Sequence, residues 1–361
     1  MTDMNLFNFR RIVTLAMLIG LVAAIGIWFR NRLKTSTQAP TASPLIETIE
    51  QVEFTPEASP EPFEELTIPY LRTRNYESSM TEPVKIAETE TYTAYLTSYN
   101  SDGLEINALL TEPKGQRPLG GWPGVIFVHG YIPPEEYQTT SQYAAYVDYL
   151  ASHDLAVFKV DLRGHGTSEG EAGGAYYSSD YVIDVLNARS ALAATSFVKK
   201  DSIGLWGHSM AGNVVLRSLA AQPEIKAAVI WAGAGYTYTD IQEFAINDNS
   251  YQPPASESPQ RQRRQQLFDA YGQFDPNSAF WRKVPATNYL SDLTGSNIQI
   301  HHATDDPVVA INYSRNLDQL LTQAGVNHQL VEYNSGGHNL TGLNFTDAME
   351  ATVSWFKNYL L

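Results

Sequence analysis

A serine at position 209 is the residue of this chain best placed to do chemistry. An apolar run over 202–206 predicts a short buried strand, and 210–221 has the pattern of a helix. Ser209 lies at their junction, and a tight strand-to-helix turn lifts a serine above the sheet as a nucleophile. Ala211 stands where such turns usually carry a second glycine, and alanine is small enough for strand and helix to pass closely. The N–H of Met210 is then placed where an oxyanion would form.

Partners for this serine follow later in the chain. A serine hydroxyl is a weak nucleophile unless a base accepts its proton and a carboxylate orients that base. After such a turn the acid and then the histidine are expected behind two later strands. Asp305 and Asp306 follow a predicted strand over 298–302, and His338 follows another over 328–333 in a glycine-rich segment. The spacing therefore predicts a triad of the serine, His338 and one of the two aspartates.

The elements that must hold these residues alternate between strand and helix from about Thr91 onward. Two runs of alternating polarity around a turn at 100–103 predict an antiparallel hairpin at one edge. Buried strands and helices then follow in turn, which is typical of a mostly parallel sheet with helices on both faces. The predicted strands cover 91–98, 104–111, 124–128, 155–161, 202–206, 226–232, 298–302 and 328–333, and the predicted helices 142–152, 178–195, 210–221, 311–324 and 345–361.

The alternation breaks over about 234–290, a segment rich in aromatic residues with a basic group at Arg261, Arg263 and Arg264. It follows a strand whose carboxyl end lies on the same rim of the sheet as the candidate serine. Because long insertions at such places are usually functional, we predict a helical cap over the pocket. A peripheral excursion on the surface is the alternative.

An uncharged apolar stretch at 12–29 is long enough to cross the core of a bilayer. It ends in Trp-Phe-Arg, a poor cleavage site for a signal peptidase, so 1–34 is predicted to be an uncleaved signal anchor with one transmembrane helix. Residues 35–65, rich in Thr, Ser, Pro and Glu, are predicted to be a disordered tether, and 66–361 the catalytic domain. A cleaved signal peptide is the alternative.

A tether of this composition favours a catalytic domain outside the cytoplasm. The glycosylation sequon Asn339-Leu340-Thr341 lies beside His338, where a glycan would block the candidate site. This position favours a bacterial cell envelope over a eukaryotic secretory route. The charges that flank the apolar stretch leave the orientation in the membrane open, because two precede it and three follow it.

Composition excludes several classes of function. The formal net charge of −15 argues against nucleic acid, and against an anionic membrane surface, as the main partner. There is no cysteine, so disulfides, thiolate chemistry and zinc-finger sites are excluded. His301 and His302 end a strand, but no acidic or histidine partner at ligand spacing predicts a metal site. His129, His165 and His208 are expected to brace loops, and the oligomeric state stays open.

From about Thr91 to Leu361 the chain resembles an α/β-hydrolase. It is most similar to the catalytic domain of the prolyl oligopeptidase (S9) serine peptidases and to the related dienelactone-hydrolase-like esterases. The resemblance is carried by SYNSDGLEINALL at 98–110, HG at 129–130, DLRGHGTSEG at 161–170, the turn at Ser209, TDDPVV at 304–309 and GH at 337–338.

The resemblance implies the fold and assigns further roles. In the family the acid stands two residues after a threonine and shortly before a Val-Val pair, which selects Asp306 and leaves Asp305 as the alternative. The second oxyanion donor, beside Met210, is placed at Tyr131. In the S9 branch a tyrosine hydroxyl donates near this point and in the esterase branch a backbone N–H does, so both remain open for Tyr131.

These predictions combine into a membrane-tethered serine hydrolase that needs no cofactor and no metal. It would cleave a small ester or a short peptide through an acyl-enzyme, as S9 peptidases do. The oligopeptidases of that family carry a large propeller, which the roughly 90 residues before the hydrolase domain do not fit. A carboxylesterase of the dienelactone-hydrolase-like branch is therefore the alternative. A catalytically silent, membrane-tethered binding module is a further alternative, against which an intact triad argues.

Overall fold

The computed structural model describes residues 61–244 and 246–361. The predicted signal anchor (1–34) and most of the predicted tether (35–65) lie outside the described residues. Among the helices that the structure describes, none has both the length and the hydropathy that a membrane span requires.

A single sheet organises the described part of the chain, with nine strands in the order β1-β2-β3-β5-β4-β6-β7-β8-β9. The first three strands pair antiparallel, as does β3 with β5, whereas all pairs from β5 through β4 to β9 are parallel. The strands are β1 (Val84–Glu88), β2 (Tyr92–Ser101), β3 (Leu104–Pro113), β4 (Trp122–Val128), β5 (Ala156–Val160), β6 (Val198–His208), β7 (Ala227–Trp231), β8 (Asn297–Ala303) and β9 (Asn327–Tyr333). The predicted mostly parallel sheet with an antiparallel hairpin at its edge is confirmed.

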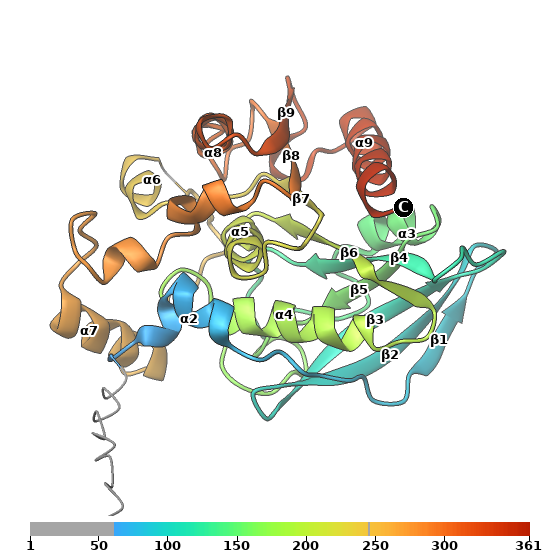
Figure 1. The fold of residues 1–361 in the computed structure, drawn as a ribbon, viewed down its shortest axis with the longest axis horizontal. Helices are drawn as coiled ribbons and strands as arrows, with labels where there is room; N and C mark the ends of the chain where they lie inside the picture. The colour runs from blue at the N-terminus through green and yellow to red at the C-terminus, as the bar shows by residue number, and fades with distance from the viewer. Residues whose placement is uncertain (1–60, 245) are drawn as a thin grey trace, which may run out of the picture. The chain divides into compact units, whose positions relative to one another are not determined.

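Helices cover both faces of this sheet (Figure 1). One core packs α4, α5 and α8 against the sheet, and the other packs α3 and α9 against the opposite face. The α-helices are α2 (Ile68–Thr73), α3 (Ala144–Ala151), α4 (Asp180–Ala193), α5 (Ala211–Ala221), α6 (Tyr238–Glu243), α7 (Pro259–Tyr271), α8 (Asn312–Ala324) and α9 (Leu343–Leu360). The 3-10 turns are η1 (Glu64–Leu66), η2 (Trp281–Lys283), η3 (Ala286–Asp292) and η4 (Gly337–Asn339).

The central strands form because their sequences can be buried on both faces. Every residue of β4, β5 and β7 is buried, which suits sequences that are apolar throughout except for Lys159 in β5. Two local predictions need correction. Strand β1 was not predicted, because it is exposed throughout and lacks a buried face. The helix predicted from Gln142 begins at Ala144, because Tyr143 adopts φ 60, which is incompatible with a helical turn.

The segment predicted as a cap (234–290) folds into α6, α7, η2 and η3 and shares an aromatic cluster with residues near the N-terminus of the described chain. The cluster consists of Leu66, Tyr238, Leu267, Phe280, Trp281 and Val284. Residues 61–66, which we call the N-terminal segment, also bond to it: the Tyr271 hydroxyl donates to Pro62 O at 2.8 Å, and Lys283 pairs with Glu61 at 3.1 Å. The last residues of the predicted tether thus belong to the folded unit.

Four buried histidines make the fold sensitive to acid. Burial lowers the pKa of His301 and of His208 to about 3, lowers that of His165 to about 4, and holds that of His129 well below its usual range. The unfolded chain therefore binds more protons below pH 6.5, so stability is lost as pH falls from about 6.5 towards 4. Burial raises the pKa of Asp161 to about 6. The folded chain therefore binds an extra proton between pH 6 and 4, and this offsets the loss of stability that one of the four histidines causes.

We expect the free energy of unfolding in urea to fall by up to about 5 kcal/mol between pH 7.5 and pH 5.5. The variant His301→Gln removes one of the four buried imidazoles, so it should shrink that fall by about 1.4 kcal/mol. Equal unfolding free energies at the two pH values would contradict the assignment of neutral buried histidines.

Candidate active site

The turn between β6 and α5 holds the candidate serine in a left-handed conformation. Ser209 has φ 56, and its N–H donates to Trp231 O on the neighbouring strand at 2.9 Å. Tight packing explains the small residues around it: a Cβ at Gly207 would lie 2.7 Å from a Val215 methyl group, and one at Gly212 would lie 2.8 Å from the Cα of Gly233. The helix therefore passes directly behind the serine.

Two loops at the same edge of the sheet bring the predicted acid and base together. The loop after β8 carries the aspartates, and the loop after β9 carries His338. The Nδ1 of His338 lies 2.8 Å from Asp306 Oδ2. Asp305 has another contact, since its Oδ1 accepts the N–H of Gly337 at 2.9 Å. Of the two aspartates, only Asp306 bonds to the histidine ring, and Asp305 holds the backbone beside it.

Asp306 is a fully buried carboxylate with four hydrogen bonds. Its Oδ1 accepts the backbone N–H groups of Val308 and Val309 at 2.8 and 3.0 Å, and its Oδ2 faces the two histidines His338 and His302. Burial raises the pKa of Asp306, but the bonds from His302 and His338 outweigh it and hold the pKa well below its usual range. The acid is therefore ionised at neutral pH and can orient an imidazole.

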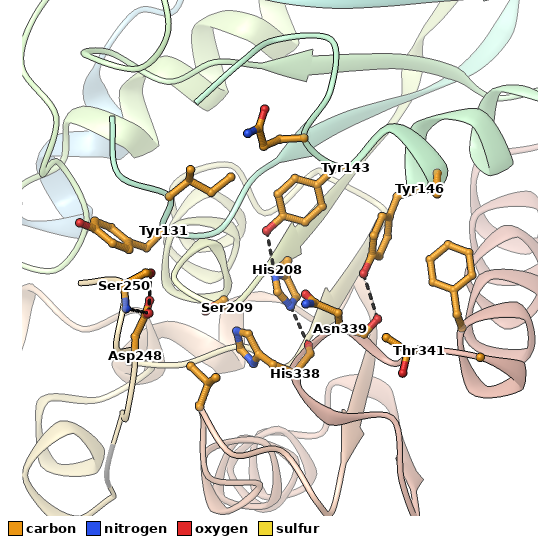
Figure 2. Close-up of a pocket in the computed structure, with 16 residues that line it drawn as sticks. Tyr131, Tyr143, Tyr146, His208, Ser209, Asp248, Ser250, His338, Asn339 and Thr341 are labelled. Atoms are coloured by element: carbon orange, nitrogen blue, oxygen red, sulfur yellow. Dashed lines mark hydrogen bonds between the residues drawn. The ribbon is translucent and has the colours of Figure 1, made fainter. Parts of the chain in front are cut away.

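The orientation of the His338 ring follows from this contact. Because an ionised carboxylate only accepts, Nδ1 of His338 must be the protonated nitrogen, which leaves Nε2 with a lone pair. Ser209 and His338 line one pocket of about 640 Å³ (Figure 2). Their side chains form no direct hydrogen bond within the described residues, and such contacts often tighten only when substrate binds.

Comparisons with known proteins show which families and chains this one is similar to. The family model described as Serine aminopeptidase, S33 matches residues 124–247, and the model described as BAAT / Acyl-CoA thioester hydrolase C terminal matches 187–344. The chain is 26% identical over 266 residues to Esterase YjfP of Escherichia coli (strain K12), a match covering 71% of this chain and 96% of that protein.

Two solved structures have a fold similar to that of this chain. An acetyl xylan esterase from Paenibacillus sp. R4 has a TM-score of 0.57 at 18% identity, covering 81% of this chain and 92% of its own. A puromycin-hydrolyzing peptidase of Mycobacterium tuberculosis has a TM-score of 0.56 at 19% identity, covering 76% of this chain but 40% of its own. The chain has the α/β-hydrolase fold. The predicted resemblance to S9 peptidases and esterases is confirmed for the fold. Sequence identities below 20% establish a shared fold but do not identify the substrate.

The two predicted oxyanion residues, Tyr131 and Met210, line or adjoin the pocket that Ser209 lines. In the described chain the N–H groups of Tyr131 and Met210 make no hydrogen bond. The Tyr131 hydroxyl accepts the N–H of Gln252 at 3.0 Å, and Figure 2 shows it directed away from Ser209, so it does not point to where an oxyanion would form. Of the two ways in which Tyr131 could donate, the geometry leaves the backbone N–H free for the pocket.

The pocket is lined by both aromatic and polar side chains. Tyr143, Tyr146 and Phe345 line it together with Asp248 and Ser250 of the cap. Among the described lining residues, Asp248 is the one aspartate or glutamate, and no lysine or arginine is present. The segment 234–290 therefore contributes a single carboxylate to the pocket.

Three residues of the site were not predicted to act there. His302 bonds to Asp306, and its position four residues before that acid is the signal that could have found it. His208 was expected to brace a loop, and it does contact the backbone of the histidine loop. The role of Tyr143 could not be predicted from the sequence. Its position depends on a left-handed backbone, whereas the sequence pattern there predicts a helix.

Proposed function

We propose that this α/β-hydrolase is a serine hydrolase that cleaves carboxylic esters through an acyl-enzyme, with Ser209 as nucleophile, His338 as base and Asp306 as the orienting acid. The observation that carries the proposal is the 2.8 Å contact between His338 Nδ1 and the buried Asp306, in the pocket that Ser209 also lines. This contact leaves the other imidazole nitrogen available for the serine proton.

The reaction then proceeds in two halves. Ser209 Oγ attacks the ester carbonyl carbon while His338 Nε2 takes its proton, and the backbone N–H groups of Tyr131 and Met210 hold the oxyanion. As the tetrahedral intermediate collapses, the C–O bond to the leaving group breaks and His338 returns the proton to the leaving alkoxide. Water, deprotonated by His338, attacks the acyl-enzyme in the same way and releases the acid and the free serine.

Ester hydrolysis is favoured over peptide hydrolysis by the extent of the matches. The esterases named above are covered nearly end to end, at 96% and 92% of their length, whereas the puromycin-hydrolyzing peptidase is covered over 40%. Peptidase activity is the second candidate, supported by the match of residues 124–247 to the model described as Serine aminopeptidase, S33.

A direct test compares the two activities on the full chain. We expect p-nitrophenyl esters of short and medium acyl chains to be hydrolysed and aminoacyl- and prolyl-p-nitroanilides to be left intact, and a fluorophosphonate probe to label the protein. Efficient anilide cleavage would make the protein a peptidase instead. Absence of both activities and of labelling would overturn the enzyme proposal and favour a binding module.

The single carboxylate of the pocket predicts selection by substrate charge. Matched p-nitrophenyl esters of 6-aminohexanoate and of adipate, with a cationic and an anionic end, should differ in kcat/KM by about fivefold in favour of the cation, since Asp248 attracts one and repels the other. In Asp248→Asn, which keeps the Oδ1 that bonds to Ser250, this ratio should approach one. An unchanged ratio in the variant would contradict the prediction.

We also propose that residues 12–29 tether the hydrolase to a membrane, with the catalytic domain outside the cytoplasm of a bacterial cell. The support is the length and hydropathy of this stretch in the sequence. The full chain should then remain with membranes after a carbonate wash, and protease added to intact spheroplasts should degrade the catalytic domain. Release by the wash would refute the tether, and protection from protease would refute the orientation.

A further inference from the structure

A chain of hydrogen bonds links the loop after β4 to the loop that carries the base. The N–H of Gly130 donates to the Tyr143 hydroxyl at 3.0 Å, and this hydroxyl lies 2.7 Å from His208 Nδ1. The other nitrogen of His208, Nε2, lies 2.8 Å from the backbone oxygen of His338. Figure 2 shows the last two contacts side by side at the pocket. Tyr143 and His208 thus connect the two loops between which the ester must bind.

The direction of each bond can be assigned. A carbonyl oxygen only accepts, so Nε2 of His208 carries the proton that bonds to His338 O. Burial and the neighbouring His338 lower the pKa of His208 to about 3, so its Nδ1 is unprotonated and accepts the Tyr143 hydroxyl proton. That hydroxyl oxygen in turn accepts from Gly130. Every donor and acceptor of the chain is satisfied in this one arrangement.

The position of Tyr143 is fixed by its surroundings. Its backbone is left-handed at φ 60, a conformation that is strained for a residue of this size and that needs support from its surroundings. Part of this support comes from the buried Lys159, whose ammonium group donates to the carbonyl of Gln142 at 2.8 Å. The Tyr143 ring also packs edge-on against Phe127, with 5.4 Å between ring centroids.

The loop at Gly130 lies directly against the serine. A Cβ at Gly130 would come within 2.9 Å of the Tyr143 hydroxyl and 3.1 Å of Ser209 Cβ. Because the N–H of Gly130 is bonded to Tyr143, the peptide before it is fixed, and the next N–H along the chain is that of Tyr131. This is the N–H to which the proposed mechanism gives the oxyanion.

We propose that Tyr143 and His208 are positioning residues that fix the oxyanion loop and the base loop relative to each other. The proposal rests on the serine-hydrolase function proposed above. Neither residue exchanges a proton with substrate. Their effect is on the geometry of the transition state, because a misplaced Tyr131 N–H weakens the oxyanion contact while leaving ground-state binding intact.

The test uses the full chain, p-nitrophenyl butyrate as substrate and an alkyl trifluoromethyl ketone, whose adduct with serine places an oxyanion in the same pocket. In Tyr143→Phe we expect kcat to fall about 10- to 100-fold with KM within about threefold, and the inhibition constant of the ketone to rise by the same factor as kcat falls. Tyr149→Phe, which alters a tyrosine of α3 that does not line the pocket, is the matched control.

A second pair of variants decides the matter if Tyr143→Phe does not fold. Glutamine at 208 can still donate to His338 O and leucine cannot, so His208→Gln should retain at least fivefold more activity than His208→Leu. Unchanged kcat in Tyr143→Phe, or a lower kcat without weaker ketone binding, would overturn the proposal, as would equal activity of the two His208 variants. If the wild-type chain neither hydrolyses the ester nor reacts with fluorophosphonate, the proposed function fails, and this proposal with it.

Discussion

Replacing Ser209 by alanine is expected to lower kcat for p-nitrophenyl butyrate by about 10⁴-fold or more, to the residual rate that the oxyanion donors and binding alone support. The reason is that the covalent route is lost with the hydroxyl, and no other nucleophile in the described pocket sits on a strand-to-helix turn. The fold should persist, because Ser209 contributes its backbone N–H to Trp231 O, which alanine also provides.

The measurement combines steady-state hydrolysis with fluorophosphonate labelling and a thermal melt. A variant that has the melting temperature of the wild type, takes up no fluorophosphonate label and has lost activity would assign the nucleophile to Ser209. Substantial label or activity in a folded Ser209→Ala protein would place the nucleophile elsewhere and refute the triad.

Asp306→Asn is expected to lower kcat by about 10³- to 10⁴-fold with little change in KM. Two backbone N–H groups bond to Oδ1, which asparagine retains, but the atom facing His338 becomes an amide nitrogen or a neutral oxygen. An amide donor at that place favours the tautomer with the proton on Nε2 of His338, and such a ring cannot accept the serine proton.

Asp305→Asn is the matched control, since its Oδ1 bonds to a backbone N–H that asparagine can still accept. We expect its kcat to stay within about threefold of the wild type, because the interaction that it loses is an exposed charge and not a bond to the ring. If the two variants lose equal activity, or if Asp305→Asn loses more, the acid has been assigned to the wrong aspartate.

The sequence predicted the central sheet well because burial on both faces leaves a simple signature. Strands β4 and β7 are continuous apolar runs, β5 is apolar except for Lys159, and helix α5 follows the serine as its pattern indicated. Strand β1 gave no such signature, because none of its residues is buried. Its pairing with β2 depends on backbone hydrogen bonds, which the identity of its side chains does not reveal.

The candidate site was predictable where chain order constrains it. The order of serine, acid and histidine behind three strands required only short-range patterns, and the structure brings Asp306 and His338 into contact. The contacts that surround this pair join residues far apart in the chain, such as Tyr143 and His208, which are 65 residues apart. The left-handed backbone of the tyrosine and the neutral state of the buried histidine both depend on tertiary packing, so no local sequence pattern predicts them.

The N-terminal segment has a consequence for limited proteolysis of this protein. Phe63 and Leu66 pack in the aromatic cluster of the cap, and Leu66 O accepts a bond from the buried guanidinium of Arg217 at 2.9 Å. Proteolytic cleavage on the amino side of Glu61 would retain these contacts. A cut after Leu66 would strip an apolar side chain from the cap and leave Arg217 short of an acceptor. A fragment that keeps the contacts of the catalytic domain intact should therefore begin no later than residue 61.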